Sequence, residues 1–417
     1  MDTRMLEPLA VPEIAPPERS LPPRQWVKEN LFSTWFNGVL TVLLAAILGW
    51  ACYRLARFVF VDARWEIVEE NITNLLVFRF PREEFWRLWA ALYVLAAAFG
   101  LGAGVAARLW SEEVREGRAR AHARLTTLRR LGPLLAVVAV FLWFAQSLEG
   151  TILVAGAAGT WTAARAGGRL VPPRHARRAG AAVLIGVAAA YLVVTAFGGV
   201  GWERWGGVLL TVFLAVSGIV ISFPLGVLLA LGRRSSFPAV RVVCVAYIEL
   251  IRGVPLITVL FLGAFMLGFF LPPGSETPSL ETRALVGLVL FTAAYVAEIV
   301  RGGLQSVPRE QIEAAQALGL SPLKTTFLIV LPQALRAVIP ALVGQFISLF
   351  KDTSLVFIIG LTELLAVSEL ITKQPEFLAQ GLIIETLFFA GFVYWAGSYW
   401  MSRESQRLER RLGVGER

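Results

Sequence analysis

Long apolar runs constrain this chain more than any other feature of its sequence. Several stretches of about 20 residues carry almost no charge, and this is the length that a helix needs to cross a bilayer. Only 17% of the residues are charged and 56% are hydrophobic, whereas about a quarter of a soluble domain is charged. Because lipid offers no partner to backbone polar groups, these runs must be helical. The sequence therefore predicts an all-α polytopic membrane protein and excludes a soluble globule.

The apolar runs predict about ten transmembrane helices. The run 133–168 is interrupted by Gln146, Glu149 and Gly150, and we interpret it as two short spans joined by a tight turn. The predicted spans are 35–59, 88–107, the two halves of 133–168, 180–197, 207–231, 242–271, 284–302, 337–371 and 380–401.

The loops between these runs indicate the orientation, because lysine and arginine concentrate in cytoplasmic loops. The chain has 39 basic and 30 acidic residues, and the excess falls in short loops, which argues against a nucleic-acid partner. The arginine-rich segments 108–130 and 169–178 should be cytoplasmic. The segment 61–87 has six acids to four arginines, and 272–282 has no basic residue, so both should face outward. This parity places both termini in the cytoplasm.

The composition changes near residue 200 and divides the chain into four parts. Many prolines and no apolar core with a cleavage site make the N-terminus a flexible cytoplasmic tail rather than a signal peptide. No internal repeat is visible in the rest of the chain. The parts are the tail 1–35, an extension 36–200 with about five spans, a motif-rich core 205–403 and a second cytoplasmic tail 404–417.

Catalytic and metal chemistry find no support in the sequence. Cys52 and Cys244 both lie in apolar runs, so no disulfide framework is expected. His122 and His175 lie in arginine-rich loops without a second ligand at metal spacing. We therefore expect no catalytic residues and no metal site.

The glycines Gly100, Gly102 and Gly104 superficially resemble a nucleotide-binding loop. They lie inside a predicted span with no strand before them. Small residues at this spacing let two membrane helices approach closely, and we expect that role instead.

The segment 306–332 predicts two short helices joined by a sharp corner. Pro308 suits the first turn of a helix, and Gly319 can take the left-handed conformation that closes one. Ser321 is a good cap for the second helix, which Pro332 should interrupt or kink. An ordinary amphipathic connector is the alternative, but a bent pair of helices with small residues suits docking on another protein.

Seven residues of this segment match a known signature at every consensus position. The pattern resembles the EAA signature of ABC-importer permeases, whose role is to contact a separate ATPase. The matching residues are Glu313, Ala314, Ala315, Gly319, Ile329, Leu331 and Pro332.

Three further segments narrow the resemblance to the polar amino acid (His/Glu/Gln/Arg/opine) permease family. They are IELIRGVPL at 248–256, AYVAEIVRGG at 294–303 and FKDTSL at 350–355. Val254 departs from the threonine that is commoner in the first of them. The resemblance covers about 205–403, and the long extension is similar to the larger permease subunit of general L-amino acid importers.

This resemblance implies a five-helix type I importer core that works by alternating access in a bacterial inner membrane. It also implies a second permease subunit, two ATP-binding subunits, a periplasmic amino acid-binding protein and an amino acid substrate. ATP and magnesium would be bound by the ATPase, because none of the four lysines here follows a glycine in a phosphate-binding loop. The chain should therefore be a transport subunit without a cofactor, not an enzyme.

Charged residues inside predicted spans each need a partner or a purpose, because burying them in lipid is costly. Glu249 and Arg252 are three residues apart, and Glu298 and Arg301 repeat that spacing. Helical neighbours at this spacing can form ion pairs. We favour two structural pairs at the cytoplasmic interface over substrate contacts.

Lys351 and Asp352 differ, because adjacent helical residues point about 100° apart and pair poorly. An amino acid needs an anion for its ammonium group and a donor for its carboxylate, and this pair supplies both. Gln345, Thr353 and Ser354 lie nearby for hydrogen bonds. The sequence leaves two interpretations of Lys351 and Asp352 open, a substrate site and a buried structural pair. In the first case, a partner permease could hold the functional site instead.

An ion-driven secondary amino acid transporter is the main alternative. It would need two pseudo-symmetric halves in one chain, and it would not need a bent docking element. A membrane-embedded enzyme would need clustered catalytic groups, which the sequence lacks.

Overall fold

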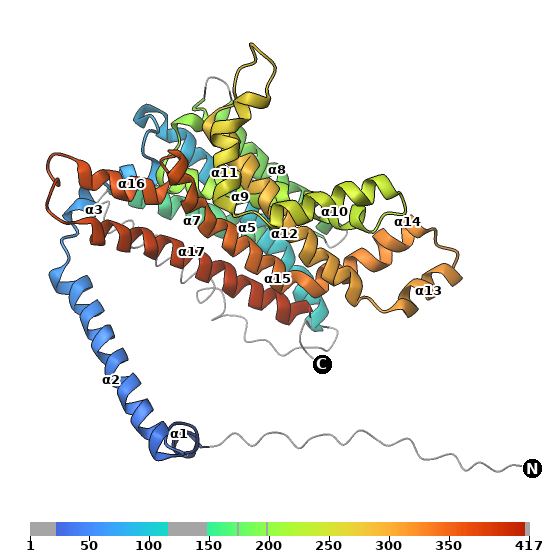
Figure 1. Ribbon diagram of the computed structural model, residues 1–417, viewed down its shortest axis with the longest axis horizontal. Coiled ribbons are helices and arrows are strands. Elements are labelled where there is room, and N and C mark those ends of the chain that lie inside the picture. Colours follow the sequence, from blue (N-terminus) through green and yellow to red (C-terminus); the bar gives the residue numbers. More distant parts are fainter. Residues whose placement is uncertain (1–21, 116–147, 173–174, 197–198, 413–417) are drawn as a thin grey trace, which may run out of the picture. The chain divides into compact units, whose positions relative to one another are not determined.

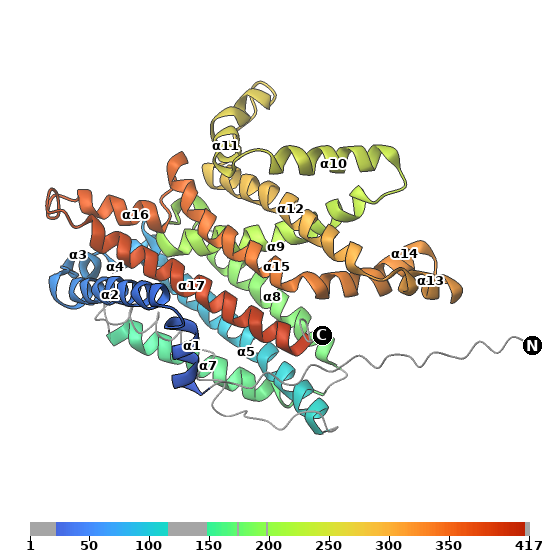
Figure 2. The same cartoon turned by 60° about the horizontal axis from the view of Figure 1, so that its bottom comes forward.

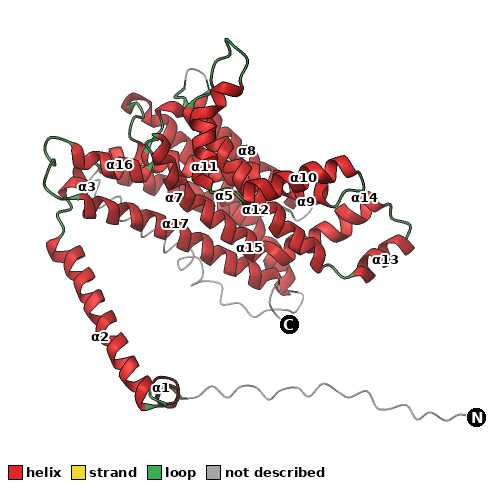
Figure 3. Ribbon diagram, in the orientation of Figure 1, coloured by secondary structure: helices red, strands yellow, loops and turns green. Residues whose placement is uncertain are grey.

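The computed structural model describes residues 22–115, 148–172, 175–196 and 199–412, and every regular element in these ranges is helical (Figure 3). The predicted all-α class is therefore confirmed for the described part of the chain. The chain divides into two compact units, Met1–Arg64 and Trp65–Arg417.

The first unit holds the helices α1 (Pro23–Leu31) and α2 (Trp35–Arg57) (Figure 1). The hydroxyl of Thr34 caps α2, since it accepts a hydrogen bond from the backbone N–H of Asn37 at 3.2 Å. Our prediction of a flexible tail up to residue 35 was wrong for α1. Proline is tolerated at the start of a helix, where its missing N–H has no partner to lose, and Pro23 occupies that position.

The extension continues in the second unit as α5 (Phe85–Arg115), α7 (Leu148–Gly168) and α8 (Ala176–Thr195). Helix α5 packs against both of the others. A Cβ atom at Gly104 would lie 2.3 Å from the carbonyl oxygen of Arg165 in α7, so only glycine allows this approach. The expected close packing is confirmed, whereas the first half of the predicted hairpin, 133–147, lies outside the described residues.

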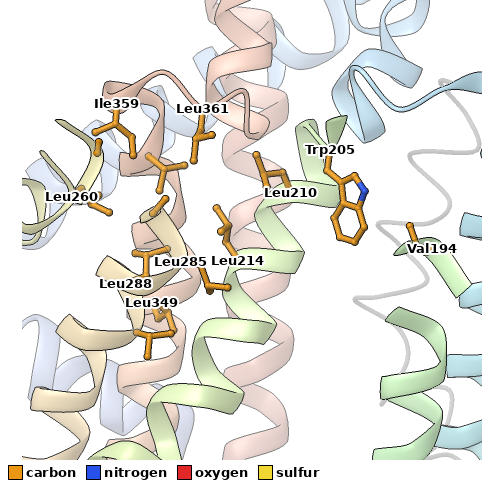
Figure 4. Packing of buried hydrophobic residues seen from close by; sticks show 14 of the residues in the cluster. Val194, Trp205, Leu210, Leu214, Leu260, Leu285, Leu288, Leu349, Ile359 and Leu361 are labelled. Carbon is orange, nitrogen blue, oxygen red and sulfur yellow. The ribbon is translucent and has the colours of Figure 1, made fainter. Parts of the chain in front are cut away.

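The second unit contains four further long helices: α9 (Gly207–Arg233), α12 (Leu280–Ser306), α15 (Leu331–Asp352) and α17 (Ile383–Leu412). Helix α12 packs against α9 and α15, and α15 packs against α17. Helices α9, α12 and α15 contribute fully buried leucines to one apolar cluster (Figure 4). Burial of each leucine side chain contributes roughly 1.5–3 kcal/mol to the stability of the fold. Members of this cluster are Leu210, Leu214, Leu288 and Leu349.

Two predicted spans are broken rather than continuous. The span 242–271 consists of α10 (Pro238–Arg252) and α11 (Leu256–Phe261) with π and 3-10 turns beyond, and the two parts meet at 107° (Figure 2). The bend coincides with Gly253 and Pro255, because proline cannot donate the hydrogen bond that would continue the helix. The prediction of one helix for this run was therefore wrong.

The span 337–371 is also divided. Helix α15 ends at Asp352, a 3-10 helix covers Thr353–Ile359, and Gly360 has a left-handed φ of 98°. The short helix α16 (Leu364–Leu370) follows. The predicted run is mostly apolar, and Gly360 supplies the turn that ends its first part.

In the described part of the chain, five helices are long and apolar enough to span a membrane, or six when the bent pair counts as one span. The number of about ten spans remains a prediction. The five are Trp35–Asp62, Arg82–Val105, Gly207–Arg233, Leu280–Ser306 and Pro322–Ile359.

Short helices lie at both ends of the second unit. The short helices α13 (Arg309–Ala317) and α14 (Pro322–Thr325) lie at one end of the core helices, and α3 (Glu66–Glu70) and α16 lie at the other (Figures 1 and 2). Next to α3, the helix α4 (Ile72–Val77) belongs to the same apolar cluster as α16. Fully buried members of that cluster are Ile67, Val68, Leu75, Leu364 and Val367.

Candidate functional site

The corner between α13 and α14 closes around Gly319, whose φ is +75°. The N–H of Leu320 donates to the carbonyl of Ala315 at 3.1 Å, and the N–H of Gly319 donates to that of Gln316 at 2.9 Å. These two bonds form a Schellman motif, which needs a left-handed residue at the glycine position. The predicted helix closure is confirmed.

The second half of the corner also follows local sequence preferences. The hydroxyl of Ser321 accepts a hydrogen bond from the backbone N–H of Lys324, and the first residue of α14 is proline. Residues Thr326–Val330 then form a π-helical turn before α15, in which Pro332 stands in the first turn. The predicted cap is confirmed. The predicted interruption at Pro332 was wrong, because the chain stays helical from α14 through the π turn into α15.

The EAA-matching residues divide between the surface and the core. Glu313, Ala314 and Gly319 are exposed, whereas Ala315 is buried. Leu331 is buried, Ile329 is half-buried and Pro332 is exposed. The buried residues therefore anchor the corner to the core, and the exposed ones form its outer surface.

Large exposed apolar side chains lie in the same segment. Leu318 is 82% exposed, Leu323 is 69% exposed and Leu328 is 63% exposed. Exposed apolar side chains of this size can serve as contacts for another protein. The corner can thus contact another protein through an apolar rim beside the carboxylate of Glu313.

Five charged side chains meet where α9, α10 and α12 converge. Glu298 pairs with Arg301 at 2.9 Å, with Arg233 at 3.5 Å and with Arg252 at 3.7 Å. Arg233 also donates to Glu249 at 2.9 Å. The three arginines and two glutamates connect three helices at the point where α10 ends.

The predicted pairing was right for one pair and wrong for the other. Glu298 and Arg301 contact each other, as their spacing indicated. Glu249 and Arg252 instead pair with Arg233 and Glu298 on neighbouring helices. Arg252 is the last residue of α10. Its side chain extends to Glu298 of α12 instead of turning back to Glu249 in the preceding turn of its own helix.

The predicted substrate residues cluster at the end of α15. Lys351 is exposed and Asp352 is half-buried, and neither side chain forms a hydrogen bond or ion pair with another described residue. Thr353 is fully buried, and its hydroxyl donates to the carbonyl of Phe350 at 2.7 Å. Gln345 lies earlier on the same helix.

Ser354 follows in the 3-10 helix and is half-buried, as is Gln345. The charges of Lys351 and Asp352 are therefore available to a ligand, whereas the hydroxyl of Thr353 is already used within the chain. Within the described ranges, no group of three or more His, Cys, Asp or Glu side chains could hold a metal ion.

The sequence did not single out a buried polar group next to this segment. The carboxylate of Glu363, which is fully buried, caps α16 and accepts a hydrogen bond from the hydroxyl of Tyr394 at 2.8 Å. The sequence signal that could have identified this group is a glutamate directly before an apolar run, which is the position of a helix cap.

Comparison with known families identifies the C-terminal half. Residues 222–414 match the family described as binding-protein-dependent transport system inner membrane component. The matched range contains both the corner at 313–319 and the charged segment at 351–352.

Comparison with individual proteins extends the similarity to most of the chain. The inner membrane amino-acid ABC transporter permease protein YhdY of Escherichia coli (strain K12) is 35% identical over 94% of this chain and 93% of its own length. The glutamate/glutamine/aspartate/asparagine transport system permease protein BztC of Rhodobacter capsulatus is 33% identical, with 93% of each chain covered. The probable glutamine ABC transporter permease protein GlnP of Bacillus subtilis is 37% identical over 50% of this chain and 92% of its own length.

Proposed function

We propose, from the premise that the chain belongs to the family of binding-protein-dependent transport system inner membrane components, that its substrates are amino acids. It is a multi-pass permease subunit of the inner membrane, and ATP hydrolysis belongs to another subunit. The support for the substrate class is the similarity over nearly the whole chain to two permeases that are named for amino acids. Family membership also removes the reason to consider an ion-driven carrier.

The observation that carries the mechanism is the exposed corner at Gly319. It presents Glu313 and an apolar rim on a rigid Schellman turn. Its buried residue Leu331 begins α15, so a push on the corner moves that helix. Helix α15 in turn ends at Lys351 and Asp352. One rigid element thus connects the ATPase-contacting surface to the charged segment.

The proposed orientation follows from the loop charges. The corner lies at the opposite end of the second unit from α3 and α16 (Figure 1), and α3 belongs to the acidic segment expected outside. The corner then faces the cytoplasm, together with both termini. A second permease, two ATP-binding subunits and a periplasmic amino acid-binding protein complete the proposed complex, with about ten spans in this chain.

The proposed substrate contacts are Lys351 and Asp352, with Gln345 and Ser354 beside them. A zwitterion would place its carboxylate on the lysine and its ammonium group on the aspartate. The buried Thr353 would support the segment from behind, since its hydroxyl is bonded to Phe350. The partner permease holds the working site if changes here leave uptake unaltered.

The substitution Glu313→Lys tests the coupling role. The side chain is exposed, so the variant should insert and fold, while an uncompensated charge at the docking surface should reduce uptake at least about tenfold. Reconstituted vesicles with the binding protein and ATPase give uptake and ATP hydrolysis together. Glu276→Lys is the matched control, because Glu276 is exposed in the loop expected outside. Normal uptake by Glu313→Lys would contradict the docking role.

Asp352→Asn tests the substrate assignment. The change keeps the size of the side chain and removes its charge, so uptake should fall while the ATPase still co-purifies with the permease. Uptake at the unmodified rate would move the site to the partner subunit.

A further inference from the structure

A buried carboxylate joins α16 to α17 directly behind the proposed substrate segment. Glu363 accepts hydrogen bonds from the backbone N–H groups of Leu365 and Ala366, both at 2.8 Å. The hydroxyl of Tyr394 donates a third bond to the same carboxylate at 2.8 Å. All of these donors converge on a side chain with no exposed surface, so the contact fixes α16 relative to α17.

The other face of Tyr394 reaches the end of α15. Its ring lies 5.4 Å from that of Phe350, centroid to centroid. Phe350 also lies close to Gly397 of the same helix α17, because a Cβ atom at Gly397 would lie 2.7 Å from its ring. The hydroxyl of Tyr394 also interacts with that of Thr353, which is bonded to the carbonyl of Phe350. Tyr394 thus touches the residues on both sides of Lys351 and Asp352.

The N-terminal end of α16 is held from α9 as well. The backbone N–H of Leu364 donates to the hydroxyl of Thr211 at 3.2 Å, and that hydroxyl donates to the carbonyl of Gly207 at 3.1 Å. Gly207 has a φ of +56°, and its N–H donates to the carbonyl of Thr362 at 2.9 Å. Residues of the three helices α9, α16 and α17 therefore fix the position of the Glu363 carboxylate.

The N-terminal extension also contacts α9 and the segment that follows α16. The side-chain amide of Gln374 donates to the side-chain oxygen of Asn71 at 2.9 Å. A Cβ atom at Gly207 would lie 2.2 Å from the carbonyl oxygen of Leu75, so α4 lies directly on the start of α9. Side chains of the extension and of α16 share one buried apolar cluster. Residues from both halves of the chain thus pack around Glu363.

We infer that Glu363 and Tyr394 are positioning residues, whose hydrogen bond fixes the end of α15 so that Lys351 and Asp352 face the transported amino acid in the correct geometry. The inference rests on the proposed substrate role of that segment. Binding groups must be held within about 0.5 Å of their productive positions, and buried neighbours with defined hydrogen bonds provide that precision. Loss of the bond should leave the fold intact and loosen the segment.

Tyr394→Phe is the direct test, because it removes one hydroxyl and keeps the ring against Phe350. The readout is the number of L-glutamine or L-glutamate molecules imported per ATP hydrolysed, in vesicles that hold the whole complex with saturating binding protein. A hydrogen bond to a buried carboxylate is worth enough to lower this ratio about tenfold. A purely structural defect would reduce uptake and ATP hydrolysis equally and leave the ratio unchanged.

Tyr399→Phe is the matched control on the same helix. The hydroxyl of Tyr399 forms no hydrogen bond with any described residue, and its ring lies against Trp395. This variant should import the same number of molecules per ATP as the unmodified protein. An equal drop in both tyrosine variants would overturn the inference.

A double variant tests whether the two residues act through one bond. Glu363→Leu, whose side chain has no oxygen to accept the bond, should lower the ratio, and adding Tyr394→Phe should lower it no further, because both changes break the same contact. Multiplied effects would contradict the inference. If Asp352→Asn lowers the ratio but Tyr394→Phe does not, only the positioning role fails. If Asp352→Asn leaves the ratio unchanged, the substrate assignment itself fails.

Discussion

Gly319→Asp separates the strain of the corner from its role in docking. A Cβ atom at Gly319 meets no other atom within 4 Å, so the side chain fits in open space. The φ of +75° costs an L-residue about 1 kcal/mol, which the fold can absorb. On a surface that another protein covers, the new unpaired carboxylate adds about 3 kcal/mol of desolvation. Association with the ATPase should then weaken by about a hundredfold.

The matched control for this change is Gly274→Asp. Gly274 has a φ of +84°, and it also has no atom within 4 Å of a Cβ, but it lies in the loop expected outside. Both variants carry the same backbone strain and the same charge. Co-purification of the ATPase and ATP-driven uptake should be lost in Gly319→Asp and kept in Gly274→Asp. Equal behaviour of the two variants would refute the reasoning.

Two other changes test the packing and the charges. Gly104→Val should lower the stability by about 3 kcal/mol, because the larger side chain forces α5 away from α7. Gly159→Val, with open space around its Cβ, should leave the unfolding temperature unchanged, and equal shifts would contradict the packing. Glu298→Gln leaves three arginines without their shared partner and should cost about 2 kcal/mol, seen as a lower unfolding temperature. No shift would show that the cluster is inert.

The corner could be predicted residue by residue because local chemistry decides it. Gly319 supplies a left-handed φ, and Ser321 supplies a cap with a proline behind it. None of these choices depends on a distant contact. The close approach of α5 and α7 was predictable for a related reason, since Gly100 and Gly104 leave room that no other residue would.

Features that depend on distant contacts could not be predicted. The run 337–371 is apolar enough to predict one span, but helix α15 ends at Asp352 in the folded chain. The cap that begins α16 draws a hydrogen bond from Tyr394, which lies 31 residues further along the chain. The same limit applies to Glu249, whose partner Arg233 stands on another helix. Apolarity and residue spacing describe one helix at a time, and they contain no information about the hydrogen bonds and ion pairs that neighbouring helices provide.

The extension illustrates a further limit. Its spans carry no motif that reveals a role, and composition alone separated it from the core near residue 200. The folded chain nevertheless places Leu75 against Gly207 and Asn71 against Gln374. The described part of the extension from residue 65 onward therefore packs directly against the core.

Site-directed crosslinking at Leu318 tests the central claim most directly. The side chain is 82% exposed on the corner, so Leu318→Cys places a thiol on the proposed ATPase contact, in a chain whose Cys52 and Cys244 are replaced by serine. In inside-out vesicles of the whole complex, a short thiol-to-amine crosslinker should join this position to the ATP-hydrolysing subunit. Crosslinking to no such subunit, or labelling of the thiol by an impermeant reagent added outside intact cells, would contradict the account.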